Sequence, residues 1–190
     1  AMRHAAQARK ELGVPTIFNI LGPLANPARP QCVAIGVARQ ELMQIVAEVL
    51  ARRGCEGFVF RGNDGLDEIS LSTTTRVLVI HQGQIREEIF DPTEIGLENF
   101  PLSALVGGTP EENATITRAI FEGKPGAHRE AVLINAAASI AAFKGEFTLG
   151  VHQQFANGYV LAKQAIDSGG AAHLVERWAV LSNELAKSSL

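Results

Sequence analysis

The sequence has no excess of positive charge, since 17 lysines and arginines stand against 20 aspartates and glutamates, giving a net charge of −3. Proteins that bind nucleic acids normally carry a basic face, so we expect no nucleic-acid partner. Uninterrupted apolar runs of about 18 residues, long enough to cross a membrane, are also missing. The first residues, Ala1-Met2-Arg3-His4, lead into a mixed amphipathic stretch and not into a secretory signal. These features predict a cytoplasmic protein without a membrane partner.

Cysteine is scarce, and nucleophile motifs are missing. Cys32 and Cys55 lie far apart, with neither a C-x-x-C pair nor a histidine at ligand spacing, so we expect two reduced, buried thiols. The sequence contains no G-x-S-x-G motif, and its five histidines share no triad or metal-ligand spacing. We therefore assign no catalytic side chain and expect chemistry that needs no covalent nucleophile.

The apolar pattern is typical of an α/β protein. Hydrophobic residues make up 46% of the chain, which is ordinary for a domain of 190 residues that buries a core. Strand, helix and strand are predicted in that order at 32–37, 40–53 and 57–60, which favours a parallel crossover. Two further strands, 76–81 and 84–90, flank a Gln-Gly turn and predict a hairpin. We expect a mixed, largely parallel sheet flanked by helices.

Both ends of the chain are predicted to be helical. A first helix covers about 2–12, and Thr109-Pro110-Glu111-Glu112 has the threonine N-cap and third-position glutamate of a helix start. The apolar spacing places Trp178 on one helix face with Leu174 and Leu181, and we expect this face in the core. The last three helices are predicted at roughly 127–144, 150–168 and 171–187.

Three carboxylates lie in the glycine-punctuated turn Gly62-Asn63-Asp64-Gly65-Leu66-Asp67-Glu68-Ile69-Ser70, directly after the apolar run 57–60. Ligands bind at strand ends in α/β sheets, and hard oxygen ligands there suit Mg²⁺ carrying a substrate phosphate. The two glycines permit a tight path that would aim Asp67 and Glu68 at one ion. Asp64 is expected to shape the turn. An isolated string of this kind is more often a solvated acidic turn, so the assignment depends on a second segment.

The second segment, 9–27, is a helix end followed by an apolar stretch that two prolines interrupt. It contains R-x-E-L-G and T-I-F-N-x-L-G-P-L-x-N-P, and D-G-L-D-E-x-S follows later in the chain. The pattern continues through Gly107-Gly108, Asn113 and Leu133-Ile134-Asn135-Ala136-Ala137. In these ordered motifs the sequence resembles the anthranilate phosphoribosyltransferase family over nearly its whole length. The resemblance implies the C-terminal α/β domain of the nucleoside phosphorylase/phosphoribosyltransferase type.

The resemblance also implies a reaction. The family transfers phosphoribosyl from phosphoribosyl pyrophosphate to the amino group of anthranilate and releases pyrophosphate, a step of tryptophan biosynthesis. Departure of a Mg²⁺-neutralised pyrophosphate leaves an oxocarbenium-like sugar that a positioned amine can capture. By resemblance, Arg9 pairs with the anthranilate carboxylate, Gly22 and Pro23 line the anthranilate channel, and Asp67 and Glu68 bind Mg²⁺. From the residues alone, the first interpretation of Arg9 is a cation near a helix C-terminus, and the alternative for Gly22-Pro23 is a simple tight turn.

The chain departs from the family pattern in two respects. The glycine-rich phosphate loop G-T-G-G-D has no equivalent here, so we expect residues 1–190 to be a single α/β domain fragment without the N-terminal helical domain. Such a fragment is expected to be inactive alone, to leave an apolar sheet edge open, and to form a homo-oligomer or pair with the missing N-terminal part. Arg61 stands where the family often has histidine, and its charge can pair with the acidic turn.

Two other functions stay open. A pyrimidine or thymidine phosphorylase shares the fold but uses free phosphate and a nucleobase, and the Arg9 helix together with the two loop motifs speaks against it. The other is a non-catalytic binding relative of the same fold. The retained Arg9, Asp67 and Glu68 count against that function, whereas the missing phosphate loop keeps it open.

Overall fold

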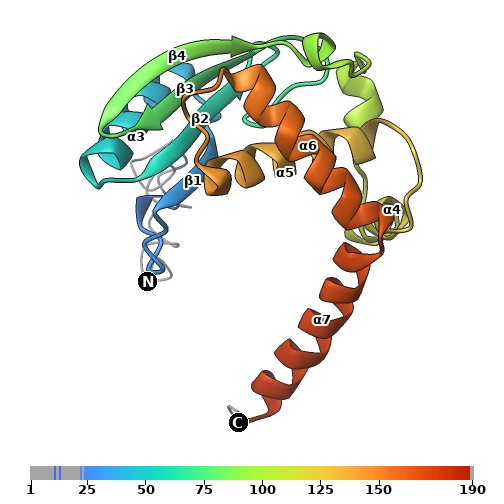
Figure 1. Ribbon diagram of the computed structural model, residues 1–190. Helices are drawn as coiled ribbons and strands as arrows, with labels where there is room; N and C mark the ends of the chain where they lie inside the picture. The colour runs from blue at the N-terminus through green and yellow to red at the C-terminus, as the bar shows by residue number, and fades with distance from the viewer. Residues whose placement is uncertain (1–10, 12, 14–21, 23, 189–190) are drawn as a thin grey trace.

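The structure, a computed structural model, describes residues 11, 13, 22 and 24–188 (Figure 1). The predicted helix at 2–12 falls almost entirely outside these residues. The strands are β1 (Cys32–Gly36), β2 (Glu56–Gly62), β3 (Thr75–His81) and β4 (Gln84–Phe90). The helices are α3 (Gln40–Arg52), α4 (Pro110–Phe121), α5 (Ala127–Lys144), α6 (Val151–Asp167) and α7 (Gly170–Ser188), with short 3-10 turns η2 (Pro92–Ile95) and η3 (Leu102–Leu105).

The four strands form one sheet in the order β1-β2-β3-β4. β1 runs parallel to β2 with α3 as the connection between them, and β2, β3 and β4 are antiparallel neighbours. The predicted α/β class and mixed sheet are confirmed. The parallel share is smaller than predicted, because one of the three pairings among the described strands is parallel. The segment between β2 and β3 contains no helix, and a parallel return usually needs one, so β3 turns back antiparallel.

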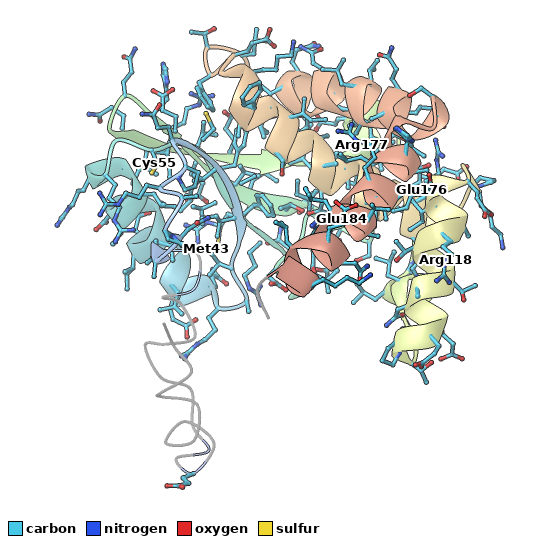
Figure 2. All side chains as sticks on the ribbon, turned by 90° about the horizontal axis from the view of Figure 1, so that it is seen from below. Met43, Cys55, Arg118, Glu176, Arg177 and Glu184 are labelled. Atoms are coloured by element: carbon cyan, nitrogen blue, oxygen red, sulfur yellow. The ribbon has the colours of Figure 1, made fainter. Side chains whose placement is uncertain are left out.

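The sheet separates two hydrophobic cores. Side chains alternate along β2, so that Phe58 and Phe60 face the core built with α5 and α6, whereas Val59 faces the core built with α3. Figure 1 shows α3 on one side of the sheet and the α5–α6 pair on the other. Met43 has no exposed surface and, with Cys55, belongs to the α3 core (Figure 2). The prediction of buried thiols holds for Cys55, but it is wrong for Cys32, which is exposed at the start of the edge strand; both are free.

The α5–α6 pair is close enough for backbone contact. A Cβ at Gly158 on α6 would lie 2.4 Å from the carbonyl oxygen of Ala137 on α5, so only glycine fits there. The alanine-rich run of α5 supplies the other small surface, and Ala137, Ala138, Ala141 and Ala142 are buried. The expected role of this run, close core packing, is therefore confirmed. α5 thereby becomes a fixed support under the sheet.

Helix α4 begins as predicted. The Thr109 hydroxyl accepts a hydrogen bond from the Glu112 N–H, and the Glu112 carboxylate accepts one from the Thr109 N–H at 2.7 Å, which completes a capping box. These bonds satisfy backbone donors that the first turn of a helix leaves without partners.

Helix α7 does not pack as the sequence predicts. It extends away from the sheet after its first turn (Figure 1), and Trp178 is 71% exposed, with Leu174 and Leu181 also exposed. The expectation that this face lies in the core is wrong, because the described contacts of α7 are mainly with α4 and α6 and leave these three side chains exposed. Charged residues such as Glu176 and Arg177 share the helix with the apolar face (Figure 2). Within residues 24–188, no helix is long and apolar enough to cross a bilayer.

Candidate functional site

The acidic turn predicted from the sequence lies between β2 and β3, where the parallel strands β1 and β2 end. Its main chain folds back over the end of β1. A Cβ at Gly36, the last residue of β1, would lie 1.9 Å from the carbonyl oxygen of Asp67. A hydrogen bond also joins the ends of β1 and β2, since the Val37 N–H donates to the Phe60 carbonyl at 3.0 Å. The carboxyl ends of two parallel strands and the acidic turn therefore form one compact edge, the usual ligand-binding edge of α/β sheets.

Asp64 organises the turn from inside, as predicted. Its carboxylate accepts hydrogen bonds at 2.5 Å from the hydroxyls of Ser70 and Ser72, and at 3.1 Å from the Leu66 N–H. Partial burial alone would raise the pKa of Asp64, but these hydrogen bonds outweigh that effect and hold the pKa below its ordinary value. The Asp64 carboxylate is therefore charged and engaged within the protein. It is not free to act as a metal ligand.

A residue of α5 fastens the other end of the turn. The side-chain oxygen of Asn135 accepts from the Ile69 N–H at 2.9 Å, and its amide group donates to the Ile69 carbonyl at 3.3 Å. The same amide donates to the Ala131 carbonyl at 2.9 Å, which fixes its orientation on the helix. Ile69 is buried, so the segment directly after Glu68 is held by both packing and hydrogen bonds.

Asp67 and Glu68 themselves are exposed, and their carboxylates have no hydrogen bond or ion pair within the described residues. No group of three or more potential metal-ligating side chains occurs in that part of the chain. This arrangement suits Mg²⁺, which binds through one or two carboxylates and fills its remaining positions with water and substrate phosphates. Two unpartnered carboxylates on a braced loop therefore fit such an ion.

Arg61 forms no ion pair with the carboxylates of the acidic turn. Its guanidinium donates to the main-chain carbonyls of Ala38 at 3.1 Å and Gly62 at 3.2 Å. Arg61 thereby links the segment after β1 to the end of β2, so its role at this edge is to hold backbone in place. The carboxylates of Asp67 and Glu68 keep their charge unneutralised by this side chain.

The predicted anthranilate residues are described only in part. Arg9 and Pro23 lie outside the described residues. Gly22 is exposed, and a Cβ built on it would meet no atom within 4 Å. The structure therefore brings Asp67 and Glu68 to one edge with Gly36, and it does not test the roles of Arg9, Gly22 and Pro23.

The sequence can now be compared with known families. Residues 1–172 match the family model described as the glycosyl transferase family, a/b domain. The chain belongs to this family.

Two similar curated relatives are anthranilate phosphoribosyltransferases. The anthranilate phosphoribosyltransferase of Nocardia farcinica is 48% identical over 190 residues, covering 97% of this chain and 55% of the relative. That of Streptomyces griseus is 50% identical, covering 96% of this chain and 51% of the relative. The chain spans about half the length of the curated relatives it matches. The predicted resemblance is confirmed.

Solved structures agree with the sequence relatives. Anthranilate phosphoribosyltransferase from Thermus thermophilus matches with a TM-score of 0.81 and 38% identity, over 94% of this chain and 51% of the other. The Saccharomyces cerevisiae enzyme in complex with PRPP and Mg matches with a TM-score of 0.81 and 32% identity, over 92% of this chain and 49% of the other. The predicted domain type is confirmed by these matches.

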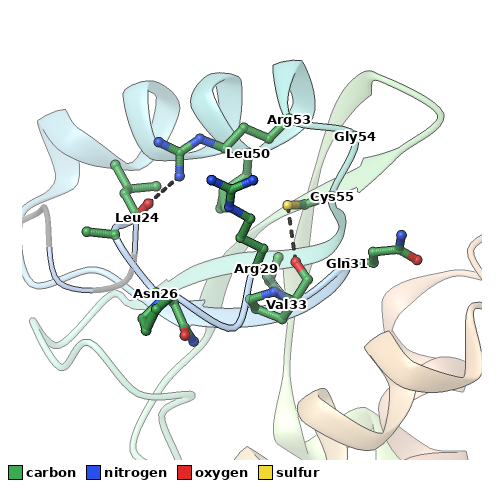
Figure 3. Close-up of a pocket in the computed structure, with 12 residues that line it drawn as sticks. Leu24, Asn26, Arg29, Gln31, Val33, Leu50, Arg53, Gly54 and Cys55 are labelled. Carbon is green, nitrogen blue, oxygen red and sulfur yellow. Dashed lines mark hydrogen bonds between the residues drawn. The ribbon is translucent and has the colours of Figure 1, made fainter.

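A separate cavity lies at the opposite end of the sheet (Figure 3). It has a volume of about 630 Å³ and lies between the loop 24–31, the start of β1 and the end of α3. Arg53 donates to the Leu24 carbonyl there, and the Cys55 thiol lies 3.5 Å from the Pro30 carbonyl. Because this cavity lies at the amino ends of the strands and contains neither Asp67 nor Glu68, it is not the candidate active site.

Mutation of Asn135 tests whether its side chain holds the acidic turn in place. Replacing Asn135→Ala removes the acceptor of the Ile69 N–H and the donor to the carbonyls of Ile69 and Ala131. We expect a loss of stability of about 1–3 kcal/mol, because the partly buried main-chain groups of Ile69 lose their side-chain partner. Amide exchange of Ile69 should accelerate by more than global destabilisation explains. Ser139→Ala, an exposed position one turn further along α5, is the matched control; equal protection of Ile69 in both variants would contradict the bracing role.

Proposed function

We propose that this domain takes part in transfer of phosphoribosyl from phosphoribosyl pyrophosphate to the amino group of anthranilate. The observation that carries the proposal is the presentation of two unpartnered carboxylates, Asp67 and Glu68, on a braced loop at the carboxyl ends of parallel strands. The names of the relatives supply the reaction, and the Saccharomyces cerevisiae enzyme of the same fold is in complex with PRPP and Mg in one structure and with 4-fluoroanthranilate in another.

In this proposal Asp67 and Glu68 hold Mg²⁺. The bound ion would neutralise charge on the pyrophosphate as it leaves the sugar. The neighbouring groups position the two carboxylates, since Gly36 admits the Asp67 main chain, Asn135 fixes Ile69, and Asp64 holds the inside of the turn. Because no covalent nucleophile is required, positioning and charge account for the catalysis proposed for these residues.

On the acceptor side we propose Arg9 as the partner of the anthranilate carboxylate, with Gly22 and Pro23 lining the path of the aromatic ring. A planar guanidinium can donate two parallel hydrogen bonds to a carboxylate. If Arg9 is only a cation near a helix end and Gly22-Pro23 only a turn, a substitution of Arg9 should affect the binding of both substrates alike. The kinetics of an Arg9 variant therefore distinguish the binding role from the structural one.

Arg9→Ala is expected to weaken anthranilate by about 30-fold or more while changing the Michaelis constant of the sugar donor little. Loss of one side of a desolvated charge pair costs on the order of 2–5 kcal/mol. Steady-state kinetics with each substrate varied in turn measure both effects, and Arg3→Ala, an arginine outside the matching motif, serves as control. An effect confined to the donor would mean that Arg9 has a structural role only.

The reaction itself is tested by following anthranilate consumption with phosphoribosyl pyrophosphate and Mg²⁺, using the protein at the full length of its relatives. Formation of the phosphoribosylated product is the expected result. A parallel assay with free phosphate and pyrimidine nucleosides tests the phosphorylase alternative. Turnover in the second assay alone would replace the proposal, and binding without turnover in either would favour the non-catalytic relative.

We also propose that the 190 residues act as one α/β domain of a larger assembly, formed with the rest of the enzyme or with a second copy. Two features support this: β1 pairs on one side only among the described strands, and α7 exposes Trp178, Leu174 and Leu181. The two free cysteines suit the cytoplasm. Sedimentation of the isolated chain should show self-association that charged substitutions at Trp178 and Leu181 reduce; a monodisperse monomer would contradict it.

A further inference from the structure

The turn between α4 and α5 encloses a small cavity that the proposed reaction does not use. Its volume is about 180 Å³, enough for an oxyanion of a few heavy atoms. The polar and charged side chains around it come from Lys124, His128 and Arg129, and Thr115 also lines the wall. No aspartate or glutamate is among the described residues that line it.

Arg129 carries the strongest evidence for a ligand. It is only 5% exposed, and its Nη2 atom donates to the Asp167 carboxylate at 2.6 Å. Its other terminal nitrogen, Nη1, is buried and has no hydrogen-bond partner in the described part of the chain. Nη1 lies 3.6 Å from the position that a Cβ would occupy at Gly123, so it points to the turn that closes the cavity. A buried guanidinium N–H without an acceptor is costly, and an oxygen in the cavity would satisfy it.

The start of α5 adds further donors. The N-cap residue Gly126 has no side chain that could accept hydrogen bonds from the first-turn N–H groups, and none is formed there by a capping side chain. The positive end of the dipole of an 18-residue helix therefore faces the turn. His128 Nε2 is likewise buried without a partner among the described residues, and it donates when it carries the proton.

The charged side chains that line the cavity are both cations, Lys124 and Arg129. The nearby carboxylates are engaged within the protein: Asp167 accepts from Arg129 and Lys163, and Glu130 accepts from the Tyr159 hydroxyl. Lys124 is exposed. An anion in the cavity would therefore meet two cations and no carboxylate in the described lining.

We propose that this cavity is a binding site for a phosphate-sized oxyanion, held by Arg129 Nη1, His128 Nε2, the first turn of α5 and Lys124. The site is built from residues other than those of the acidic turn, and it does not depend on the proposed reaction. The ligand is either inorganic phosphate or the terminal phosphate group of a small metabolite, since both present the same oxygens.

The test is titration of the Mg²⁺-free protein with inorganic phosphate, followed by ³¹P NMR and by calorimetry at constant ionic strength set with chloride. A second titration with ribose 5-phosphate distinguishes the two sources, because binding of both ligands assigns the phosphate group of a metabolite and binding of phosphate alone assigns the free ion. Arg129→Lys is expected to weaken phosphate binding by about tenfold or more, because the lysine ammonium cannot contact both Asp167 and the bound anion as the guanidinium can. Lys124→Gln, an exposed change that leaves the buried ion pair intact, should weaken it severalfold.

Lys144→Gln removes the same charge at the far end of α5 and should leave phosphate binding unchanged. Asp67→Asn with Glu68→Gln should also leave it unchanged, which separates this site from the proposed active edge. The proposal is overturned if Lys124→Gln and the parent protein bind phosphate equally, or if titration with phosphate against a constant chloride background shows no binding.

Discussion

Asp67→Asn combined with Glu68→Gln is expected to lower turnover by orders of magnitude and to abolish measurable Mg²⁺ binding at this edge of the sheet. Both substitutions preserve side-chain size, and neither carboxylate has a partner in the described residues, so no hydrogen bond or ion pair of that part of the fold is lost. What is lost is the proposed pair of oxygen ligands, and with them the Mg²⁺ whose positive charge would neutralise the leaving pyrophosphate.

The measurement has two parts: turnover as a function of Mg²⁺ concentration, and direct titration of the protein with the metal. Glu98→Gln with Glu184→Gln is the matched control, since it removes two exposed carboxylates elsewhere on the surface that have no ion-pair partner within residues 24–188. Near-normal turnover of the double variant at limiting Mg²⁺ would sink the assignment of Asp67 and Glu68. Normal thermal unfolding of both double variants would show that any loss is chemical.

Local patterns predicted most of the secondary structure. The apolar run of β2, the Gln-Gly hairpin and the Thr109 capping box each depend on residues close in sequence, and each is found as expected. The exposed face of α7 was not predicted, because helical spacing of Leu174, Trp178 and Leu181 reveals an apolar face but not whether anything covers it.

Contacts between residues far apart in sequence were also not predicted at the candidate site. The acidic turn together with the family resemblance pointed to Asp67 and Glu68, but nothing local to Asn135 indicates that its amide binds Ile69, since 66 residues separate them. Gly36 gave no signal either, because a glycine at the end of a strand is ordinary until the loop that crosses it is known. The glycine that ends β1 and the amide on α5 acquire their roles only through the tertiary arrangement that brings the acidic turn onto them.

Gly36→Ala is the second change with a large expected effect, although it adds one methyl group and removes no charge. The new Cβ would lie 1.9 Å from the Asp67 carbonyl oxygen and 2.7 Å from the carbonyl carbon, so the Asp67 main chain must move away. Ordinary contact begins at 3.4 Å, and the required shift is therefore more than an ångström. A misplacement of about 1 Å at reacting groups costs roughly a hundredfold in rate.

Turnover of Gly36→Ala is accordingly expected to fall by about a hundredfold, with weaker Mg²⁺ binding, although Asp67 and Glu68 are both retained. The control is Gly150→Ala at the start of α6, where the new Cβ would meet only the Glu88 carboxylate at 3.6 Å, an ordinary contact. Thermal unfolding of both variants separates displacement of the loop from loss of the fold, since Asn135, Asp64 and the two cores remain in place. If Gly36→Ala binds Mg²⁺ and turns over like the parent protein, the end of β1 does not determine where the Asp67 carboxylate is held.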